Sequence, residues 1–215
     1  METELTEALL DLSIPITEII GGGGGEAKVT DRLKRKLWAA GWPKTIITIR
    51  KIINGVERES VTHEIDHVRT FQEGTAALEI EWNNKDPFFD RDLENFKRLH
   101  GEGAFSVGII VTRGESFQSE IRSLVLRYAR ERNVSDFGQF PAELRYRPSE
   151  RFREEVTELV RKGRPFPQVW AERFCSDKYG QSTTHWKKLE ARVSRGVGNP
   201  CPLLMIGIPS CVVRF

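Results

Sequence analysis

Three acidic side chains of this sequence, Asp66, Glu79 and Glu81, stand where two neighbouring strands would bring them together. Apolar residues alternate along 75–82, so both glutamates fall on one face of a predicted strand. The stretch 61–68 is also strand-like, and a hairpin that joins the two puts Asp66 opposite Glu79. Carboxylates packed this closely repel one another unless a positive charge lies among them. A hard divalent cation that takes oxygen ligands, Mg²⁺ above all, is the natural occupant.

The surroundings of these acids favour a functional centre over the common alternative, which is a solvated polar face on an edge hairpin. Gln72-Glu73-Gly74 has the composition of the required turn. The other face of the second strand is continuously apolar, which indicates a buried sheet: Ala76, Leu78, Ile80 and Trp82. The strand then runs into the polar segment Asn83-Asn84-Lys85-Asp86-Pro87, which carries a cation and two amides.

Phosphodiester hydrolysis is the chemistry that explains this arrangement best. Asp66 and Glu79 would each give an oxygen to Mg²⁺, and the backbone carbonyl of Ile80 could give another. Such a metal polarises a scissile phosphate and lowers the pKa of a bound water. Glu81 could orient or deprotonate that water, or help to hold a second metal. Lys85 could offset phosphate charge.

Composition sets the outer bounds. A chain of 215 residues with 39% hydrophobic residues fits one domain with a sizeable core. Its formal net charge is only +2 and its pI about 8.5, which permits a nucleic-acid partner without proving one. The sequence has no apolar run of membrane-spanning length and no secretory signal. Three cysteines without zinc spacing indicate reduced thiols in a cytosolic protein: Cys175, Cys201 and Cys211.

The N-terminal part predicts two helices separated by glycines. Apolar residues over 1–20 have near-helical spacing that Pro15 interrupts, so we expect a helix and then a break. The five glycines of 21–25 are not followed by Gly-Lys-Ser/Thr, so they predict a flexible connector and no nucleotide-phosphate loop. Residues 1–27 are therefore expected to precede a single domain over 28–215. Thr30 or Asp31 is predicted to cap a helix that ends at Gly41. Its basic residues are either solvated or face DNA: Lys28, Arg32, Lys34, Arg35 and Lys36.

Further elements follow from local periodicity. The β-branched stretch 45–53 predicts a strand that turns at Asn54-Gly55. A helix over 92–100 and a buried strand over 105–111 complete a crossover unit with the acidic strand, for which parallel pairing is expected. The later expectations are a helix over 117–128, loops over 136–148, a helix from a Ser149 cap to Gly163, irregular structure over 165–181, a helix after 182–184 and a strand over 202–208.

Asp66 with Glu79-Ile80-Glu81 thirteen residues on resembles the core motif of PD-(D/E)xK nucleases, and more narrowly that of the BglII/BstYI group of type II restriction endonucleases. Three further blocks carry the likeness: 33–42, which ends in Gly-Trp, Gly180-Gln181-Ser182-Thr183-Thr184, and 201–208. Together they cover about 28–209. The wider superfamily usually has lysine where this chain has Glu81, and BglII-type enzymes have glutamine. Glutamate is similar to the BamHI variant, so the role of Glu81 and the number of metals stay open.

The resemblance implies an α/β fold, a restriction-endonuclease-like core with a central mixed β-sheet flanked by helices. It implies a cytoplasmic prokaryotic enzyme that needs Mg²⁺, for which Mn²⁺ could substitute, and no nucleotide cofactor. A homodimer would cleave double-stranded DNA at a short palindrome and leave 5′-phosphate ends, because a two-fold protein reads a two-fold site. Residues 133–200 would contribute recognition elements. The candidates for DNA contacts are Asn83, Asn84 and Lys85, and Ser182, Thr183, Thr184 and His185.

Two other functions fit the same residues. A repair or structure-selective nuclease could use the same core, and would nick DNA without producing discrete fragments. A non-catalytic DNA-binding regulator could use the hairpin only structurally, and would bind DNA independently of Mg²⁺. The recognition sequence does not follow from the residues, because base specificity depends on loop geometry.

Overall fold

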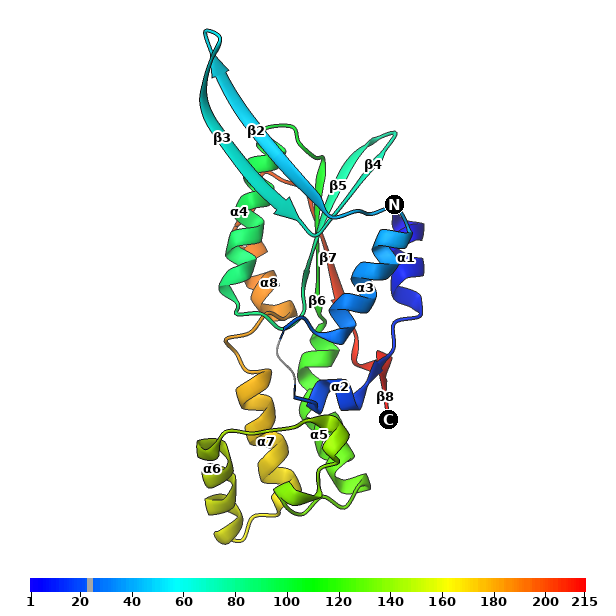
Figure 1. The fold of residues 1–215 in the computed structure, drawn as a ribbon, viewed down its shortest axis with the longest axis vertical. Coiled ribbons are helices and arrows are strands. Elements are labelled where there is room, and N and C mark those ends of the chain that lie inside the picture. Colours follow the sequence, from blue (N-terminus) through cyan, green and yellow to red (C-terminus); the bar gives the residue numbers. More distant parts are fainter. Residues whose placement is uncertain (23–24) are drawn as a thin grey trace.

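The computed structural model describes residues 1–22 and 25–215, and its centre is a four-stranded mixed sheet in the order β4-β5-β6-β7 (Figure 1). The strands are β4 (His67–Phe71), β5 (Gly74–Glu81), β6 (Val107–Arg113) and β7 (Leu203–Ile208). β4 runs antiparallel to β5, whereas β5, β6 and β7 are mutually parallel neighbours. The expected α/β fold with a central mixed sheet is confirmed.

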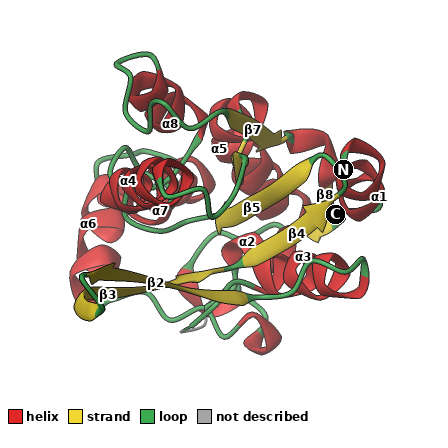
Figure 2. Cartoon of the chain, turned by 90° about the horizontal axis from the view of Figure 1, so that it is seen from above, coloured by secondary structure: helices red, strands yellow, loops and turns green. Residues whose placement is uncertain are grey.

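Helices cover both faces of this sheet (Figure 2). The parallel pairing of β5 with β6 is made through α4 (Pro87–Gly101), as expected for a crossover unit. β6 leads to β7 through α5 (Glu115–Glu131), α6 (Glu150–Arg161), α7 (Phe166–Lys178) and α8 (Trp186–Val193). The connections between α5 and α6 contain the short 3₁₀ helices Phe137–Gln139 and Ala142–Leu144, and a third, Ser210–Val212, follows β7.

Two apolar clusters fix the helices to the sheet. On one face, α4 and α8 bury Leu93, Phe96 and Leu189 against Ala77 of β5 and Ile110 of β6. The opposite face has the larger cluster, in which α3 (Lys28–Ala39), α5 and α7 pack against β5 and β6. β5 therefore has both faces covered, and its polar glutamates lie inside the protein.

The N-terminal segment packs into the same larger cluster. α1 (Glu2–Leu10), β1 (Ile14–Pro15) and α2 (Ile16–Ile20) show the expected helix with a break at Pro15. Leu5, Leu12 and Ile19 of this segment are buried in the core. β1 pairs in parallel with β8 (Val213–Arg214), which joins the two ends of the chain. The predicted glycine connector includes positions 23 and 24, which lie outside the described residues.

A long two-stranded ribbon projects from the body in Figure 1. It consists of β2 (Thr45–Ile53) and β3 (Val56–Ile65) in antiparallel pairing. Asn54 and Gly55 turn it with φ angles of 52° and 78°, the left-handed pair that an Asn-Gly hairpin turn requires. The strand expected over 61–68 is divided at Asp66, because β3 ends at Ile65 and β4 begins at His67.

Two local predictions were wrong. α3 begins at Lys28 with Ala27 as its N-cap, because Thr30 is buried and Asp31 instead pairs with Arg35 one turn on. Residues 166–178 form the helix α7 and not irregular structure. Pro165 and Pro167 had obscured it, although proline is tolerated in the first turn of a helix, where the N–H groups lack partners within it. The Ser149 cap is confirmed, since the Phe152 N–H donates to Ser149 Oγ at 3.3 Å.

No helix in the described part of the chain combines the length and apolar character needed to cross a bilayer.

Candidate active site

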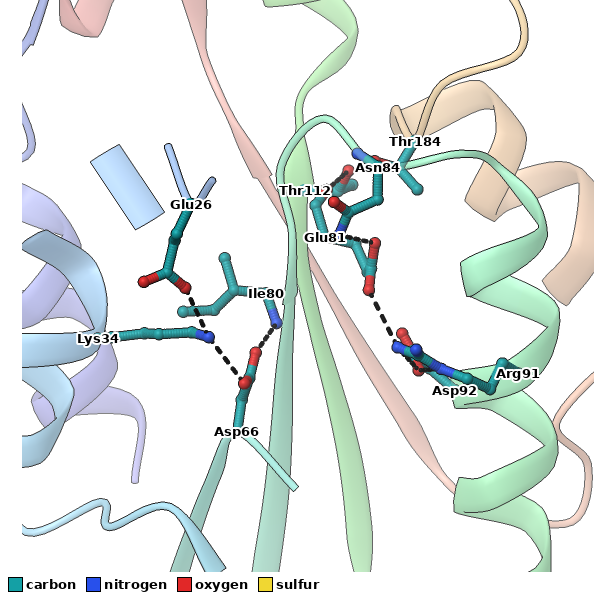
Figure 3. A network of polar contacts seen from close by, with 10 residues as sticks. All are labelled: Glu26, Lys34, Asp66, Ile80, Glu81, Asn84, Arg91, Asp92, Thr112 and Thr184. Atoms are coloured by element: carbon teal, nitrogen blue, oxygen red, sulfur yellow. Dashed lines mark hydrogen bonds and ion pairs between the residues drawn. The ribbon is translucent and has the colours of Figure 1, made fainter. Parts of the chain in front are cut away.

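Asp66 lies at the bend between the ribbon and the central sheet. The β4–β5 register pairs His67 with Leu78, and extending it by one residue places Asp66 opposite Glu79, as the hairpin predicted. Both carboxylate oxygens of Asp66 have partners (Figure 3). Oδ2 accepts a hydrogen bond from the Ile80 N–H at 3.3 Å, and Oδ1 lies 2.8 Å from Nζ of Lys34. The carboxylate is thus fixed to β5 from one side and to α3 from the other.

Glu79 and Glu81 are buried on the face of β5 that α4 covers. Glu79 is 8% exposed and Glu81 3% exposed. Asp92, in the first part of α4, is 1% exposed and adds a third buried carboxylate to this face. Arg91 binds Asp92 Oδ1 at 2.8 Å, but Asp92 Oδ2 has no hydrogen-bond partner. Together with Asp66 these side chains form what we call the acidic centre, which has four members: Asp66, Glu79, Glu81 and Asp92.

The electrostatics of this centre favour protonated carboxyls. Burial, followed by the charges of Asp92 and Asp66, raises the pKa of Glu79 to about 9. Burial and the charge of Asp92 likewise raise the pKa of Glu81 to about 8. Burial also raises the pKa of Asp92. Such groups would ionise together only if a cation compensated their charge.

Glu81 is oriented by the polar segment that follows its strand. The Asn84 side-chain amide donates to Glu81 Oε2 at 2.7 Å, and Arg91 lies 3.6 Å from Oε1. The Thr112 hydroxyl donates to the Glu81 backbone carbonyl at 2.7 Å, which fixes the end of β5 to β6. These contacts hold the carboxylate at the mouth of the acidic centre.

The two predicted DNA-contact segments, far apart in sequence, meet at this point. The Thr184 N–H donates to the Asn84 carbonyl at 2.8 Å, and the Asn84 N–H donates to Thr184 Oγ1 at 3.0 Å. Lys85 and Thr183 form an antiparallel bridge, and the Asp86 N–H donates to the Ser182 carbonyl. Residues 84–86 and 182–184 therefore form one surface, which we call the paired polar edge.

Arg113, the last residue of β6, lies fully buried beneath the paired polar edge. Its guanidinium donates to the carbonyls of Trp82 and Thr184 and to the Thr183 hydroxyl, at 2.9, 2.7 and 2.6 Å. Burial lowers its pKa to about 10, which leaves it charged at neutral pH. A single cation thereby fixes the late segment to the end of β5.

The predicted DNA-contact residues differ in how far they reach the surface. Asn84, Lys85 and Ser182 are exposed. Asn83 is half-buried and donates to the Lys178 carbonyl, while Thr183 donates to Gly180 and accepts from Arg113. Thr184 and His185 are buried, and neither ring nitrogen of His185 has a partner.

A cavity of about 1070 Å³ opens beside the acidic centre. Its lining includes Asp66, Ile80, Glu81 and Asn84. Five cationic side chains also line it: Lys28, Lys34, Arg132, Arg145 and Lys178. Three more acidic side chains, Glu18, Glu26 and Glu143, also contribute to the lining. The five cations could bind the phosphates of a ligand that enters beside the acidic centre.

The family model described as Restriction endonuclease BglII/BglIII matches residues 2–208 of the chain. The chain belongs to this family. It is therefore a restriction endonuclease by family, which makes it a DNA-binding nuclease. No curated protein and no solved structure matches the chain.

Restriction endonucleases typically need a divalent metal, and the donor chemistry of the acidic centre fits one. Within residues 1–22 and 25–215, no three His, Cys, Asp or Glu side chains converge closely enough to hold a metal ion. Asp66 instead binds Lys34 and the Ile80 N–H, and Glu81 accepts from Asn84. The donors are all carboxylates, three of them have a raised pKa, and Asp92 Oδ2 is buried without a hydrogen-bond partner. A hard cation would satisfy each of these features.

Sequence reasoning did not connect Asp92 or Lys34 with the acidic centre, although it named Lys34 among the basic residues that could face DNA. Asp92 had a local signal, since it shares a helix face with Phe89 and Phe96, three and four positions away, and both are buried. A carboxylate on an apolar face is expensive unless it has a role. Lys34 had no such signal, because only the packing of α3 against the sheet brings it to Asp66.

Proposed function

We propose that this protein is a type II site-specific deoxyribonuclease. It hydrolyses double-stranded DNA at a short palindrome in the prokaryotic cytoplasm, as a homodimer that depends on Mg²⁺, and leaves 5′-phosphate ends. The observation that carries the proposal is the hydrogen bond from Asn84 to Glu81. It joins the acidic centre to the paired polar edge, so one rigid unit contains both the groups for phosphodiester hydrolysis and the groups for reading bases.

Asp66, Glu79 and the backbone carbonyl of Ile80 would hold Mg²⁺, and Mn²⁺ could replace it. The metal would polarise the scissile phosphate and acidify a water molecule. Glu81, with a pKa raised to about 8, is protonated at pH 7 in the metal-free protein. A bound cation would lower that pKa, and the ionised carboxylate could then accept the proton of the attacking water. Asn84 keeps the accepting oxygen at a fixed position, and Arg91 limits its rotation from the other side.

DNA recognition is assigned to the paired polar edge. Lys85, Asn84 and Ser182 are exposed and can reach base edges or phosphates. The less exposed candidates have a supporting role and hold this surface in place: Asn83, Thr183, Thr184 and His185. The cations that line the cavity would neutralise backbone phosphates on either side of the scissile bond.

Glu79→Ala tests the assignment. Because Glu79 is a proposed metal ligand and touches no base, we expect cleavage of plasmid DNA with Mg²⁺ to be lost while DNA binding is retained. Glu94→Ala is the matched control, since Glu94 is a solvent-exposed glutamate of α4 that pairs only with Lys97 in the described structure. Near wild-type cutting by Glu79→Ala would contradict the site.

The products distinguish this function from the alternatives. Discrete fragments whose sequenced ends share one palindrome support site-specific cleavage. A smear, or nicking confined to flaps and junctions, indicates a repair or structure-selective nuclease. Sedimentation of the protein with a palindromic duplex tests the dimer, because two subunits per duplex are expected and one would refute it.

A further inference from the structure

Lys34 contacts Asp66, one of the proposed metal ligands, and the acidic motif does not include it. It extends from α3, and its Nζ lies 2.8 Å from Asp66 Oδ1 and 2.8 Å from Glu26 Oε1 (Figure 3). The Lys34 side chain is 31% exposed and lines the cavity beside the acidic centre. Burial alone would lower the pKa of Lys34, but hydrogen bonds to Asp66 and Glu26 raise it, so the ammonium stays charged at neutral pH.

The ammonium occupies a coordination position of Asp66. Oδ2 of this carboxylate is already bound to the Ile80 N–H, and Oδ1 is bound to Lys34. The ammonium 2.8 Å from Oδ1 uses one lone pair of this oxygen and repels a divalent cation that approaches it, so Asp66 binds a metal through Oδ1 more readily once Lys34 has moved away. Lys34 and a divalent cation thus compete for one oxygen.

Glu26 determines where the displaced ammonium goes. Its carboxylate is 45% exposed and holds the same Nζ from the cavity side. A lysine side chain has a flexible four-carbon stem, so its ammonium can leave Asp66 and stay within the cavity. The space that it then reaches is the space assigned to the DNA backbone, next to Ile80 and Glu81.

We propose that Lys34 has two alternating positions in catalysis. Without a metal it neutralises Asp66, and when Asp66 becomes a metal ligand Lys34 turns to a non-bridging oxygen of the scissile phosphate and stabilises the charge that develops there. This inference rests on the proposed function, and assigns to α3 a catalytic residue that the acidic motif on β4 and β5 does not contain.

The two roles predict opposite effects of one substitution. In Lys34→Met the competitor for Asp66 is absent, so Mn²⁺ should bind the DNA-free protein more tightly, by about threefold to fivefold for an ion pair of this exposure. The same variant lacks the cation on the phosphate, so kcat for DNA cleavage should fall by about 100-fold with a smaller change in KM. If Lys34 only supported the fold, its replacement by Met would not raise the affinity of the protein for Mn²⁺.

The experiment measures Mn²⁺ affinity by titration calorimetry without DNA, and cleavage kinetics separately. Lys97→Met is the matched control, because Lys97 forms a surface ion pair with Glu94 on α4 and lies outside the cavity lining. Its Mn²⁺ affinity and kcat should equal those of wild type. Lys34→Arg keeps the charge and should bind Mn²⁺ like wild type, which separates competition from a general loosening of the site.

Unchanged or weaker Mn²⁺ binding by Lys34→Met would overturn the competition, and an unchanged kcat would overturn the contact with phosphate. Failure of the proposed function looks different. In that case wild type and Lys97→Met also fail to cut DNA, while the Mn²⁺ titrations without DNA still report whether Lys34 competes for Asp66. Thermal melting of Lys34→Met confirms that the variant is folded, as expected for a partly exposed side chain.

Discussion

The raised pKa values of the acidic centre make the metal-free protein less stable as pH rises above neutrality. Glu79 and Glu81 have pKa values of about 9 and about 8 in the folded protein, against an ordinary value of 4.5. At pH 7 the native state therefore holds two protons that the unfolded chain has released. The free energy of unfolding falls with rising pH wherever the native state binds more protons than the unfolded chain. For these glutamates the fall continues until the pH has passed through the pKa of the folded state.

The size of the effect follows from the two pKa values. A fully protonated carboxyl contributes a slope of about 1.4 kcal/mol per pH unit, and Glu81 loses half of its protons by pH 8. Between pH 7 and 8 the free energy of unfolding should then decrease by about 2 kcal/mol, in roughly equal parts from the two glutamates. Burial lowers the pKa values of two histidines, His67 and His185. Their effect on the free energy of unfolding therefore falls mainly below pH 7, and it offsets little of the decrease between pH 7 and 8.

Urea denaturation in EDTA at pH 7.0, 7.5 and 8.0 measures this decrease. Glu79→Gln and Glu81→Gln mimic the protonated carboxyl without titrating, so each should remove about 1 kcal/mol of it. The double variant should lose most of the decrease, and any remainder would come from Asp92, whose pKa burial also raises. A wild-type stability that is constant or increases from pH 7 to 8 would refute the reasoning, as would a double variant that retains the full decrease.

Other predictions follow from individual contacts. Asn84→Ala removes a hydrogen bond that lowers the pKa of Glu81, so the pH profile of DNA cleavage should shift to higher pH, whereas an unshifted profile would separate Glu81 from proton transfer. Arg113→Met removes the buried donor to Thr183 and Thr184, and should lower the free energy of unfolding by about 2–4 kcal/mol in urea while amide exchange at 182–185 accelerates. The cavity cations predict that DNA affinity falls steeply with salt, and Arg145→Ala should reduce the slope of log K against log salt by about one unit, with no change expected if Arg145 faces no phosphate.

The sequence predicted what is encoded locally. The alternation along 75–82 identified β5 and both of its glutamates, because a strand that is apolar on one face and acidic on the other shows this pattern in every second residue. The Asn54-Gly55 turn and the Ser149 cap were also predictable, since each depends on backbone preferences of one or two residues. The position of Asp66 opposite Glu79 was predictable from the turn between the two strands alone.

What the sequence could not supply were contacts between elements that packing alone brings together. Lys34 reaches Asp66 because α3 lies against the sheet, and Asn84 meets Thr184 across 100 positions of sequence. The two candidate DNA-contact segments could be named separately, but their backbone pairing depends on the position of Arg113 beneath both. α7 was missed because two prolines outweighed a helical pattern of apolar residues that are buried all around the helix.

The paired polar edge also has a consequence for synthesis of the protein. The strand that carries Glu79 and Glu81 leaves the ribosome long before residues 182–184, which complete the edge, and before β7, which completes the sheet. Domains assemble from the N-terminal side as the chain grows. A nascent or truncated chain that stops before residue 182 therefore has the acidic side chains without the segment that Arg113 fixes beside them. We therefore expect an unfinished chain not to cut DNA, because its proposed base-reading surface is incomplete.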